Sequence, residues 1–592
     1  MNRILQSHLD GFIQEYGLQH ENTYKQFEKF CNFSILSSKL ATFDLDDVTT
    51  GNGDDGVDGI AIIVNEESVI SKEDAETIFR SQRKNNDVEV VFIQSKTSES
   101  FDLGDFLKFK ESILRFCNAN EESYIANDST QKEAHSVFNQ VITNVPKVRN
   151  GKPDISIYFV TAGNYARPEA LETAKNDMFT QINELGLFEN ITIKFFGRTE
   201  LIQAWIASHN GIEASLDTYS NAALPTINDV NEAYLAIVKA KDYINNLLIN
   251  EDGSLRNQLF EENVRHFLGS DNSVNEQIGN TLLDDREKDR FPFLNNGITI
   301  VSPDVQLQGT KLHLRNFQII NGCQTSHVLY ENRHNISDDV MVSLKVIETA
   351  NEELFGSLVK ATNSQSKIED SQFLSLKPIT KRIEAYFNTY EDNEGRLYFE
   401  RRDRQYSGKE IPAIRIINLQ TIARCVCAMF IRRPDLSFKF PRKIYNEFSQ
   451  EIFKEQNREI IYYASALALY RFNLLCANGA IPTNMRKFKW HILPIIAILI
   501  SGEKMPELNS KKIETYAQNI INKFQAHNQE GTNIFQLAIE IIQSVDNLTD
   551  DRLKGQVIFE ELLSETKQTI AKLGLHTQPI TCVATPHSTH ES

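Results

Sequence analysis

The sequence predicts an α/β domain at residues 1–215, an α+β domain at 225–380 and a mostly α-helical domain at 381–575. One hydrophobic core cannot serve 592 residues, so several domains are expected. Strand-length apolar runs alternate with helical patterns in the first part, mix with them in the second, and become rare in the third. The last residues, 576–592, show no apolar periodicity, which predicts a disordered tail.

Composition restricts the class of protein. Apolar residues make up 41% and charged residues 24% of the chain, as in ordinary globular proteins. The net charge of −18 argues against a surface coated with positive charge, but it allows a local basic groove, because salt screens charges beyond roughly 8 Å. The seven cysteines include no CxxC pair, so a zinc ribbon is not expected and the thiols should be reduced. No apolar run suits a signal peptide or a membrane span, so we expect a cytoplasmic protein without membrane insertion.

The first part alternates helices and strands. A helix is predicted over 3–31, the segment 118–153 reads as a polar loop, and SNAALPT reads as a linker after the domain. Strands followed by helices indicate a partly parallel sheet. The expected strands are IAIIV (60–64), VEVVFIQ (88–94), ISIYFVTAG (155–163) and ITIKFFG (191–197), with a helix at 168–186.

Three polar residues stand at the ends of two of these strands. Asp58 directly precedes IAIIV, and Gln94 and Lys96 are two residues apart, so their side chains leave the same face. Metal-dependent phosphodiester hydrolysis needs a carboxylate on a rigid element, a second oxygen ligand and a nearby cation. A lysine at the end of an apolar strand also needs a partner, and Asp58 is the expected one. A structural salt bridge in an inactive sheet is the alternative interpretation.

The stretch GDDGVDGIAIIV followed by VEVVFIQSKTS resembles the core of PD-(D/E)xK nucleases, especially Mrr-like restriction endonucleases. This resemblance implies a restriction-endonuclease-like fold for residues 1–215 and Mg²⁺ or Mn²⁺ as cofactor. It implies that Asp58 binds the metal, that Gln94 stands in place of the usual Glu, and that Lys96 is the catalytic lysine. Glu28, on the first helix, is a weaker candidate for an additional acidic ligand. An amide at position 94 brings no charge, so a lower metal affinity and turnover are expected.

The middle part contains three Asn-rich clusters: FPFLNNGITIVS, FQIINGCQTSHVLY and VKATNSQSKIEDSQF. Helices are expected at 229–247 and 351–362. Turns and helix caps explain the clusters most simply. A recognition pocket is the alternative, because Asn and Gln side chains can read base edges. Its members would be Asn295, Asn296, Asn321, Gln324, Asn363 and Gln365.

A second resemblance covers roughly residues 225–440. LFEENVRHFLGSDNSVN, FPFLNNGITI, QIINGCQTS and ATNSQSKI, in this order, resemble the AIPR family, whose name stands for abortive infection phage resistance. RLYFERRDRQY and the earlier FIQSKTSESFD pattern are also similar to that family. The resemblance implies bacterial antiphage defence and assigns no role to the Asn-rich clusters.

Residues 396–445 are locally basic, with twelve Lys/Arg against four acids. Aromatic residues lie between the basic ones, a pattern that suits phosphate contact and base stacking. A solvated helical face with arginines in salt bridges is the alternative. The candidate nucleic-acid-binding residues are Arg401, Arg402, Arg404, Arg432 and Arg433.

Together these features lead us to expect a Mg²⁺-dependent endonuclease that hydrolyses DNA in antiphage defence. A homodimer would supply two sites for double-strand cleavage, and a phage-derived trigger or a partner defence protein would activate it. The alternatives are a non-cleaving nucleic-acid-binding sensor or effector subunit and an RNA-directed nuclease.

Overall fold

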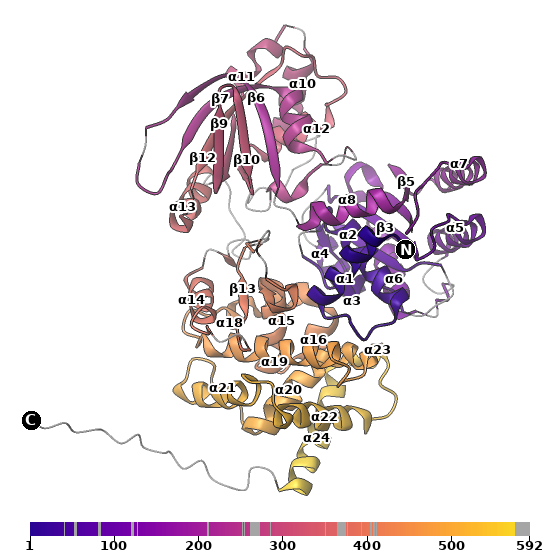
Figure 1. Ribbon diagram of the computed structural model, residues 1–592, viewed down its shortest axis with the longest axis vertical. Coiled ribbons are helices and arrows are strands. Elements are labelled where there is room, and N and C mark those ends of the chain that lie inside the picture. Colours follow the sequence, from indigo (N-terminus) through magenta and orange to yellow (C-terminus); the bar gives the residue numbers. More distant parts are fainter. Residues whose placement is uncertain are drawn as a thin grey trace, which may run out of the picture. The chain divides into compact units, whose positions relative to one another are not determined.

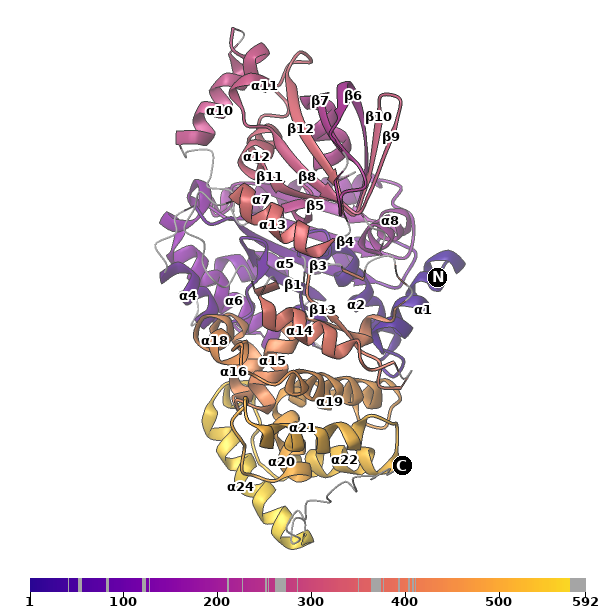
Figure 2. The same cartoon turned by 90° about the vertical axis from the view of Figure 1, so that its left-hand side faces the viewer.

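The computed structural model forms two compact units (Figures 1 and 2). Unit 1 comprises residues 1–381 and 399–420, and unit 2 comprises 382–398 and 421 onward. The structure describes residues 1–574 except 41, 52–55, 81–84, 120–123, 127, 210–211, 226, 251–252, 254, 261–272, 285, 350, 364–373, 376, 392–393, 403–404, 407–408 and 410.

The N-terminal α/β part, residues 1–209, is built on a five-stranded sheet of order β2-β1-β3-β4-β5. β1 runs antiparallel to β3, whereas β3, β4 and β5 are parallel to one another. The mixed α/β sheet expected from the sequence is therefore present. The strands are β1 (Gly59–Val64), β2 (Glu67–Ser68), β3 (Val88–Lys96), β4 (Asp154–Thr161) and β5 (Ile191–Phe196).

Helices cover both faces of this sheet (Figure 1). Val90 and Phe92 of β3 pack into one apolar layer, and Val91 and Ile93 pack into the other, as the alternation of side chains along a strand requires. The first layer is covered by α4 (Lys72–Arg80), α5 (Leu103–Asn118), α6 (Ser129–Thr143) and α7 (Glu169–Glu184), and the second by α1 (Arg3–Tyr16), α2 (Thr23–Leu36) and α8 (Arg198–His209).

Two sequence predictions for this part were wrong. The single helix at 3–31 is two helices, because Gly17 adopts a left-handed conformation with φ of 66° and ends α1. Asn22 then caps α2 by accepting a hydrogen bond from the Lys25 amide. The expected polar loop contains α6, capped by Asp128 and held on the sheet by apolar residues such as Phe138.

The middle part, residues 213–363, holds a seven-stranded sheet of order β11-β8-β12-β7-β6-β10-β9, in which β12 and β8 are the parallel pair. Apolar residues of α10 (Ser273–Leu283) and α12 (Cys323–Glu331) pack on one face, and α13 (Glu352–Asn363) packs on the other. The strands are β6 (Glu213–Ala223), β7 (Ala233–Lys239), β8 (Ile298–Ser302), β9 (Asp304–Gln308), β10 (Lys311–Arg315), β11 (Gln318–Asn321) and β12 (Met341–Glu348).

Two further predictions failed here. SNAALPT is not a linker, since most of it forms the end of β6, where Asn221 pairs with Ala236 of β7. The helix expected at 229–247 is instead β7 followed by helical turns from Ala240 to Leu248. β7 pairs with both β6 and β12, so ladder hydrogen bonds on two sides override the helical tendency of its sequence. The expected helix at 351–362 is confirmed as α13.

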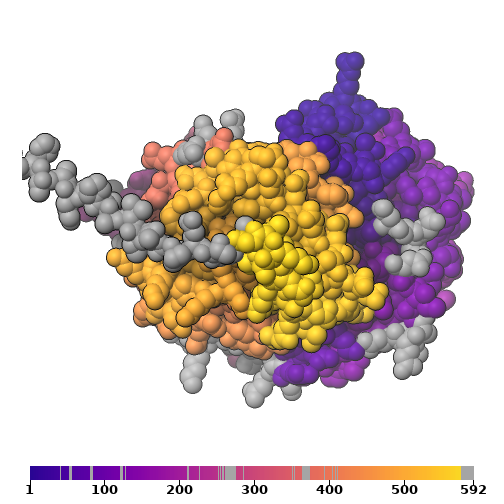
Figure 3. Space-filling view, turned by 90° about the horizontal axis from the view of Figure 1, so that it is seen from below, coloured from indigo at the N-terminus to yellow at the C-terminus, as the bar shows by residue number. Residues whose placement is uncertain are grey.

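Unit 2 is helical, as expected for the C-terminal part. The apolar run WHILPIIAILI forms a buried helix, α20 (Lys489–Ser501), and Cys425 and Cys427 are free buried thiols. In the space-filling view α24 (Gln556–Leu573), in yellow, lies on the surface of this unit (Figure 3). Among the described residues one helix, α19 (Ile460–Ala477), has the length and apolar composition of a membrane span, but 89% of it is buried inside the protein.

The other elements complete the chain. They are α3 (Leu45–Val48), α9 (Ala240–Tyr243), α11 (Phe291–Leu294), α14 (Pro378–Phe387), β13 (Tyr398–Glu400), β14 (Ile416–Asn418), α15 (Leu419–Met429), α16 (Pro434–Lys439), α17 (Pro441–Lys443), α18 (Ser449–Ile452), α21 (Lys511–Phe524), α22 (Gln529–Gln543) and α23 (Asp550–Leu553).

Candidate metal site at the ends of β1 and β3

Asp58 stands at the start of β1 and is fixed by β3. Its backbone N–H donates to the Ile93 carbonyl at 2.9 Å, in the register that pairs Gly59 with Ile93. Its carboxylate Oδ2 accepts the backbone N–H of Ser95 at 2.8 Å and lies 3.4 Å from the Ser95 hydroxyl. The sheet therefore holds this carboxylate in one position, as a metal ligand requires.

Gln94 is buried beside it, with 1% of its surface exposed. Its amide oxygen Oε1 has no hydrogen-bond partner among the described residues. Its amide nitrogen lies against Gly56, where an added Cβ would come within 3.1 Å of Nε2 and where φ is +70°. A buried carbonyl oxygen without a partner is unfavourable, so this atom is available to a ligand.

Lys96 ends β3 and is about one-third exposed. Its ammonium lies 3.5 Å from Asp105 Oδ1 of α5, and this is its ion pair among the residues that the structure describes. The ion pair expected between Lys96 and Asp58 does not form. The two residues are nevertheless close enough for the positive charge of Lys96 to lower the pKa of Asp58.

One face of α2 completes the site. Lys25, Glu28 and Asn32, at positions i, i+3 and i+7, share that face. Lys25 forms an ion pair with Glu28, and Asn32 donates from its amide to the Asp58 carbonyl at 3.2 Å. The sequence had indicated Glu28 alone, although the spacing of Lys25 and Asn32 around it was a readable signal.

The electrostatics of the site favour a bound cation. Burial is the largest cause that raises the pKa of Asp58, opposed by the Ser95 N–H and by the charges of Lys96 and Lys25. Burial, followed by the charge of Asp58, raises the pKa of Glu28 to about 7. Two partly buried carboxyl groups, of which one raises the pKa of the other, are stabilised in their charged forms by a cation placed between them.

The available ligands suit a hard divalent ion. Asp58 and Glu28 offer carboxylate oxygens, and Gln94 offers the unpartnered amide oxygen, the donor set that Mg²⁺ and Mn²⁺ prefer. No cluster of three or more His, Cys, Asp or Glu side chains with metal-binding geometry occurs in the described part of the chain. Asp54 and Asp55, which could add carboxylates, lie outside the described residues.

The first two Asn-rich clusters of the middle part form turns, as one interpretation expected, and most of the third lies outside the described residues. Gly297 and Gly322 have φ of +75° and +97°, which explains the two Asn-Gly pairs. Asn295 Nδ2 donates to the Thr325 hydroxyl at 3.0 Å, and Gln324 Oε1 accepts from Asn275 at 2.8 Å. These bonds link α10, and the residue that caps the end of α11, to α12.

The other predicted pocket residues are less informative. Asn296 is exposed, Asn321 ends β11, and Asn363 ends α13. Gln365 lies outside the described residues. A recognition pocket therefore stays a prediction.

Most of the candidate basic residues are engaged within the protein. Arg401 is 2% exposed and donates to the Ser375 carbonyl at 2.6 Å, so its guanidinium does not face solvent. Arg402 lies over the Phe355 ring at 5.5 Å. Arg433 forms a two-pronged ion pair with Asp435, and Arg432 donates to the Glu503 carbonyl. Arg404 lies outside the described residues.

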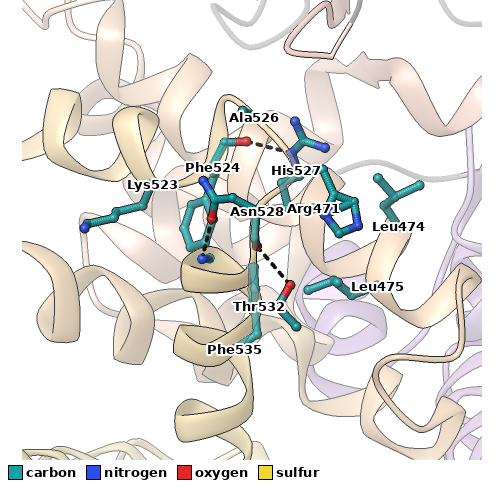
Figure 4. A pocket seen from close by; sticks show the side chains of 11 residues that line it. Arg471, Leu474, Leu475, Lys523, Phe524, Ala526, His527, Asn528, Thr532 and Phe535 are labelled. Carbon is teal, nitrogen blue, oxygen red and sulfur yellow. Dashed lines mark hydrogen bonds between the residues drawn. The ribbon is translucent and has the colours of Figure 1, made fainter.

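A shallow pocket in unit 2 was not anticipated from the sequence (Figure 4). Arg471 stands at its wall but donates to the Phe524 and Gln525 carbonyls, each at 2.6 Å. This guanidinium ties helices together and leaves no charge directed at a ligand. The lining residues are Arg471, Leu474, Leu475, Lys523, Phe524, Ala526, His527, Asn528, Gly531, Thr532 and Phe535.

Comparison with known proteins bears on the second half of the chain. Residues 260–549 match the model of the family described as AIPR protein. The match supports membership of the AIPR family. This AIPR segment runs from the middle sheet into unit 2 and does not include the site at β1 and β3. No match was found among curated proteins or among solved structures.

Proposed function

We propose that the N-terminal α/β part is a divalent-metal-dependent endonuclease that hydrolyses phosphodiester bonds of DNA. The observation that carries the proposal is the presence, at the neighbouring ends of β1 and β3, of a partly buried, sheet-held carboxylate, Asp58, and a buried amide oxygen, that of Gln94, which lacks a partner among the described residues. Both polar groups are costly to bury without a ligand, and a hard cation compensates for both.

Each residue has a distinct role in this proposal. Asp58 and Gln94 would hold the metal, and Glu28 would add a second carboxylate. A bound Mg²⁺ or Mn²⁺ supplies Lewis-acid polarisation of the phosphate and lowers the pKa of a bound water. Lys96, about one-third exposed at the end of β3, would donate to a non-bridging phosphate oxygen and stabilise developing charge. Asp105 would hold the Lys96 ammonium at the end of β3 through their ion pair.

The AIPR match suggests a role in abortive infection and antiviral defence. A nuclease fits such a role, because cutting phage or host nucleic acid stops replication. DNA as substrate rests on the resemblance of the β1–β3 stretch to restriction endonucleases. One site per chain cuts one strand, so double-strand cleavage would need a homodimer.

The test is cleavage of plasmid and phage DNA by the full chain with Mg²⁺ or Mn²⁺. The wild type is compared with Asp58→Asn and with Asp10→Asn, a matched change at an exposed aspartate of α1. We expect Asp58→Asn to slow cleavage by at least about a thousandfold, or about 4 kcal/mol of transition-state stabilisation, and Asp10→Asn to have no effect.

Two other outcomes would redirect the proposal. Cleavage of an RNA panel but not of DNA, again dependent on Asp58, would make the protein an RNA-directed nuclease. Metal-independent binding of nucleic acid, with no cleavage of either substrate, would make it a non-cleaving sensor or effector subunit.

A further inference from the structure

Lys25 is the innermost cation of the candidate site. Its ammonium contacts Glu28 Oε2, lies 2.7 Å from the Thr50 carbonyl oxygen and 3.4 Å from that of Gly51. Only 15% of its side chain is exposed. The ammonium is thus surrounded by three oxygens, the type of environment that a hard metal ion also requires.

The oxygens around Lys25 belong to the site. Thr50 donates its N–H to the Asp58 carbonyl at 3.2 Å and its hydroxyl to the Val57 carbonyl at 2.6 Å. Thr49 bridges to Gly59 at the start of β1. The segment 49–51, which presents two of the three oxygens, is therefore held against Asp58 and the start of β1.

A neighbouring lysine shows what an ordinary structural pair looks like in the same helix. Lys29 is bonded to Glu21 at 2.7 Å and to Asp46 at 2.8 Å. Neither acid is a proposed ligand. Lys25 differs because its partner is Glu28, a proposed ligand, and because its charge also acts on Asp58.

We propose that Lys25 is a tethered counter-cation that competes with the divalent metal for Glu28 and so sets the metal affinity of the site. The inference rests on the proposed function, since it assumes that the metal binds at Asp58 and Glu28. Metal entry exchanges the Lys25 ammonium at Glu28 for the ion, and the positive charge of Lys25 repels the ion throughout. The site would then be occupied only when free metal is abundant.

Direct Mn²⁺ binding to the full chain, measured by titration calorimetry without nucleic acid, tests the inference. Lys25→Met removes the charge and keeps a side chain of similar length. Lys152→Met is the matched control, because Lys152 is exposed and precedes β4 at the opposite end of the sheet from the site. We expect Lys25→Met to lower the Kd for Mn²⁺ by about tenfold or more and Lys152→Met to leave it unchanged.

Two controls keep the inference separate from the proposed function. Asp58→Asn should abolish the binding in the wild-type and Lys25→Met backgrounds. If wild-type binding depends on Asp58 but Lys25→Met binds no more tightly, the counter-cation role is wrong and the metal site stands. If no binding depends on Asp58, the proposed nuclease site itself is wrong.

A fold control is also needed. Thermal melts without metal identify a variant that does not fold. Lys25→Gln keeps hydrogen-bond donors for the two carbonyls without the charge, so it replaces Lys25→Met if the latter unfolds. Tighter binding by Lys25→Gln supports the inference, and unchanged or weaker binding overturns it.

Discussion

Two regions of the protein contain charged residues that the sequence indicates as functional: the site at β1 and β3 and the basic stretch at 396–445. They differ in whether their polar groups find hydrogen-bond partners within the protein. At the site the polar groups lack part of their possible hydrogen bonding. Ser95 donates to one oxygen of the Asp58 carboxylate, Oδ2, and the Gln94 amide oxygen has no partner among the described residues. In the basic stretch, Arg401 is bonded to a carbonyl, Arg433 to Asp435 and Arg424 to the Ser437 carbonyl.

The difference separates two uses of buried polarity. Groups that lack partners cost stability and persist where a ligand supplies the missing interaction. Groups whose hydrogen bonds are made inside the fold hold elements together and have nothing left for a ligand. The site at β1 and β3 has the first character, and Arg401, Arg424 and Arg433 of the basic stretch have the second.

Among the changes considered for these two regions, Lys96→Ala has the largest expected effect, on the rate of DNA cleavage. It should slow DNA cleavage by about a hundredfold to a thousandfold while changing the Kd for Mn²⁺ less than about threefold, because Lys96 is proposed to stabilise charge on the phosphate and not to bind metal. Single-turnover cleavage and titration calorimetry measure the two quantities. Mn²⁺ binding that is lost together with cleavage would show that Lys96 shapes the metal site and has no separate catalytic role.

The part of the site that lies on strands could be predicted from the sequence. Asp58, Gln94 and Lys96 follow from the positions of two apolar strands, since strand geometry fixes which side chains share a face. Lys25 and Asn32 were missed, because their approach depends on how α2 packs on the sheet. The Lys96–Asp105 pair also depends on packing, since α5 follows β3 across a loop whose path the sequence does not specify.

The sequence was less informative where composition was the only signal. Twelve basic residues in 396–445 indicate a cationic surface only if their side chains reach solvent. Arg401 and Arg424 do not, because each is buried with backbone carbonyls that need a donor. The strand β7 was misassigned for a related reason: its pairing partners lie far along the chain, and local propensity does not report them.

The protonation of His491 tests whether Asp435, an acid of the basic stretch, is already fully paired within the protein. Burial lowers its pKa from 6.5 to about 4, and Asp435 and the Leu553 backbone oppose that shift only in part. Asp435 is already paired with Arg433, so a proton on His491 gains little from it. Below pH 6.5 the unfolded chain binds a proton that the folded protein takes up only near pH 4. The free energy of unfolding should therefore fall by about 3 kcal/mol as the pH falls through this window.

Urea unfolding of wild type and His491→Leu at pH 7.5 and 4.5 measures this contribution. The variant should lose less stability on acidification by about 2–3 kcal/mol, because it has no imidazole to protonate. An equal loss of stability in the two proteins would mean that Asp435 stabilises the charged imidazolium of His491, although it also pairs with Arg433.

Arg401→Met should lower the free energy of unfolding by about 2 kcal/mol, since it leaves the Ser375 carbonyl without its charged donor. Lys409→Met, at an exposed lysine of the same stretch, should change it by less than about 0.5 kcal/mol. Chemical unfolding measures both.

Should the stretch bind nucleic acid, Lys409→Met should weaken binding in a filter assay and reduce its salt dependence. A larger binding defect in folded Arg401→Met would show that Arg401 is released towards nucleic acid.

Ser95→Ala gives the smallest expected change and sharpens the account of how Asp58 is held. The backbone N–H of Ser95 lies 2.8 Å from Asp58 Oδ2, whereas the hydroxyl lies at 3.4 Å, so the main chain makes the stronger bond. Removing the hydroxyl should change the cleavage rate and the Mn²⁺ Kd by less than about threefold, because the donor that matters remains. A tenfold or larger loss would mean that the hydroxyl, and not the strand backbone, orients the carboxylate. The metal position would then depend on a side chain that the sheet does not fix.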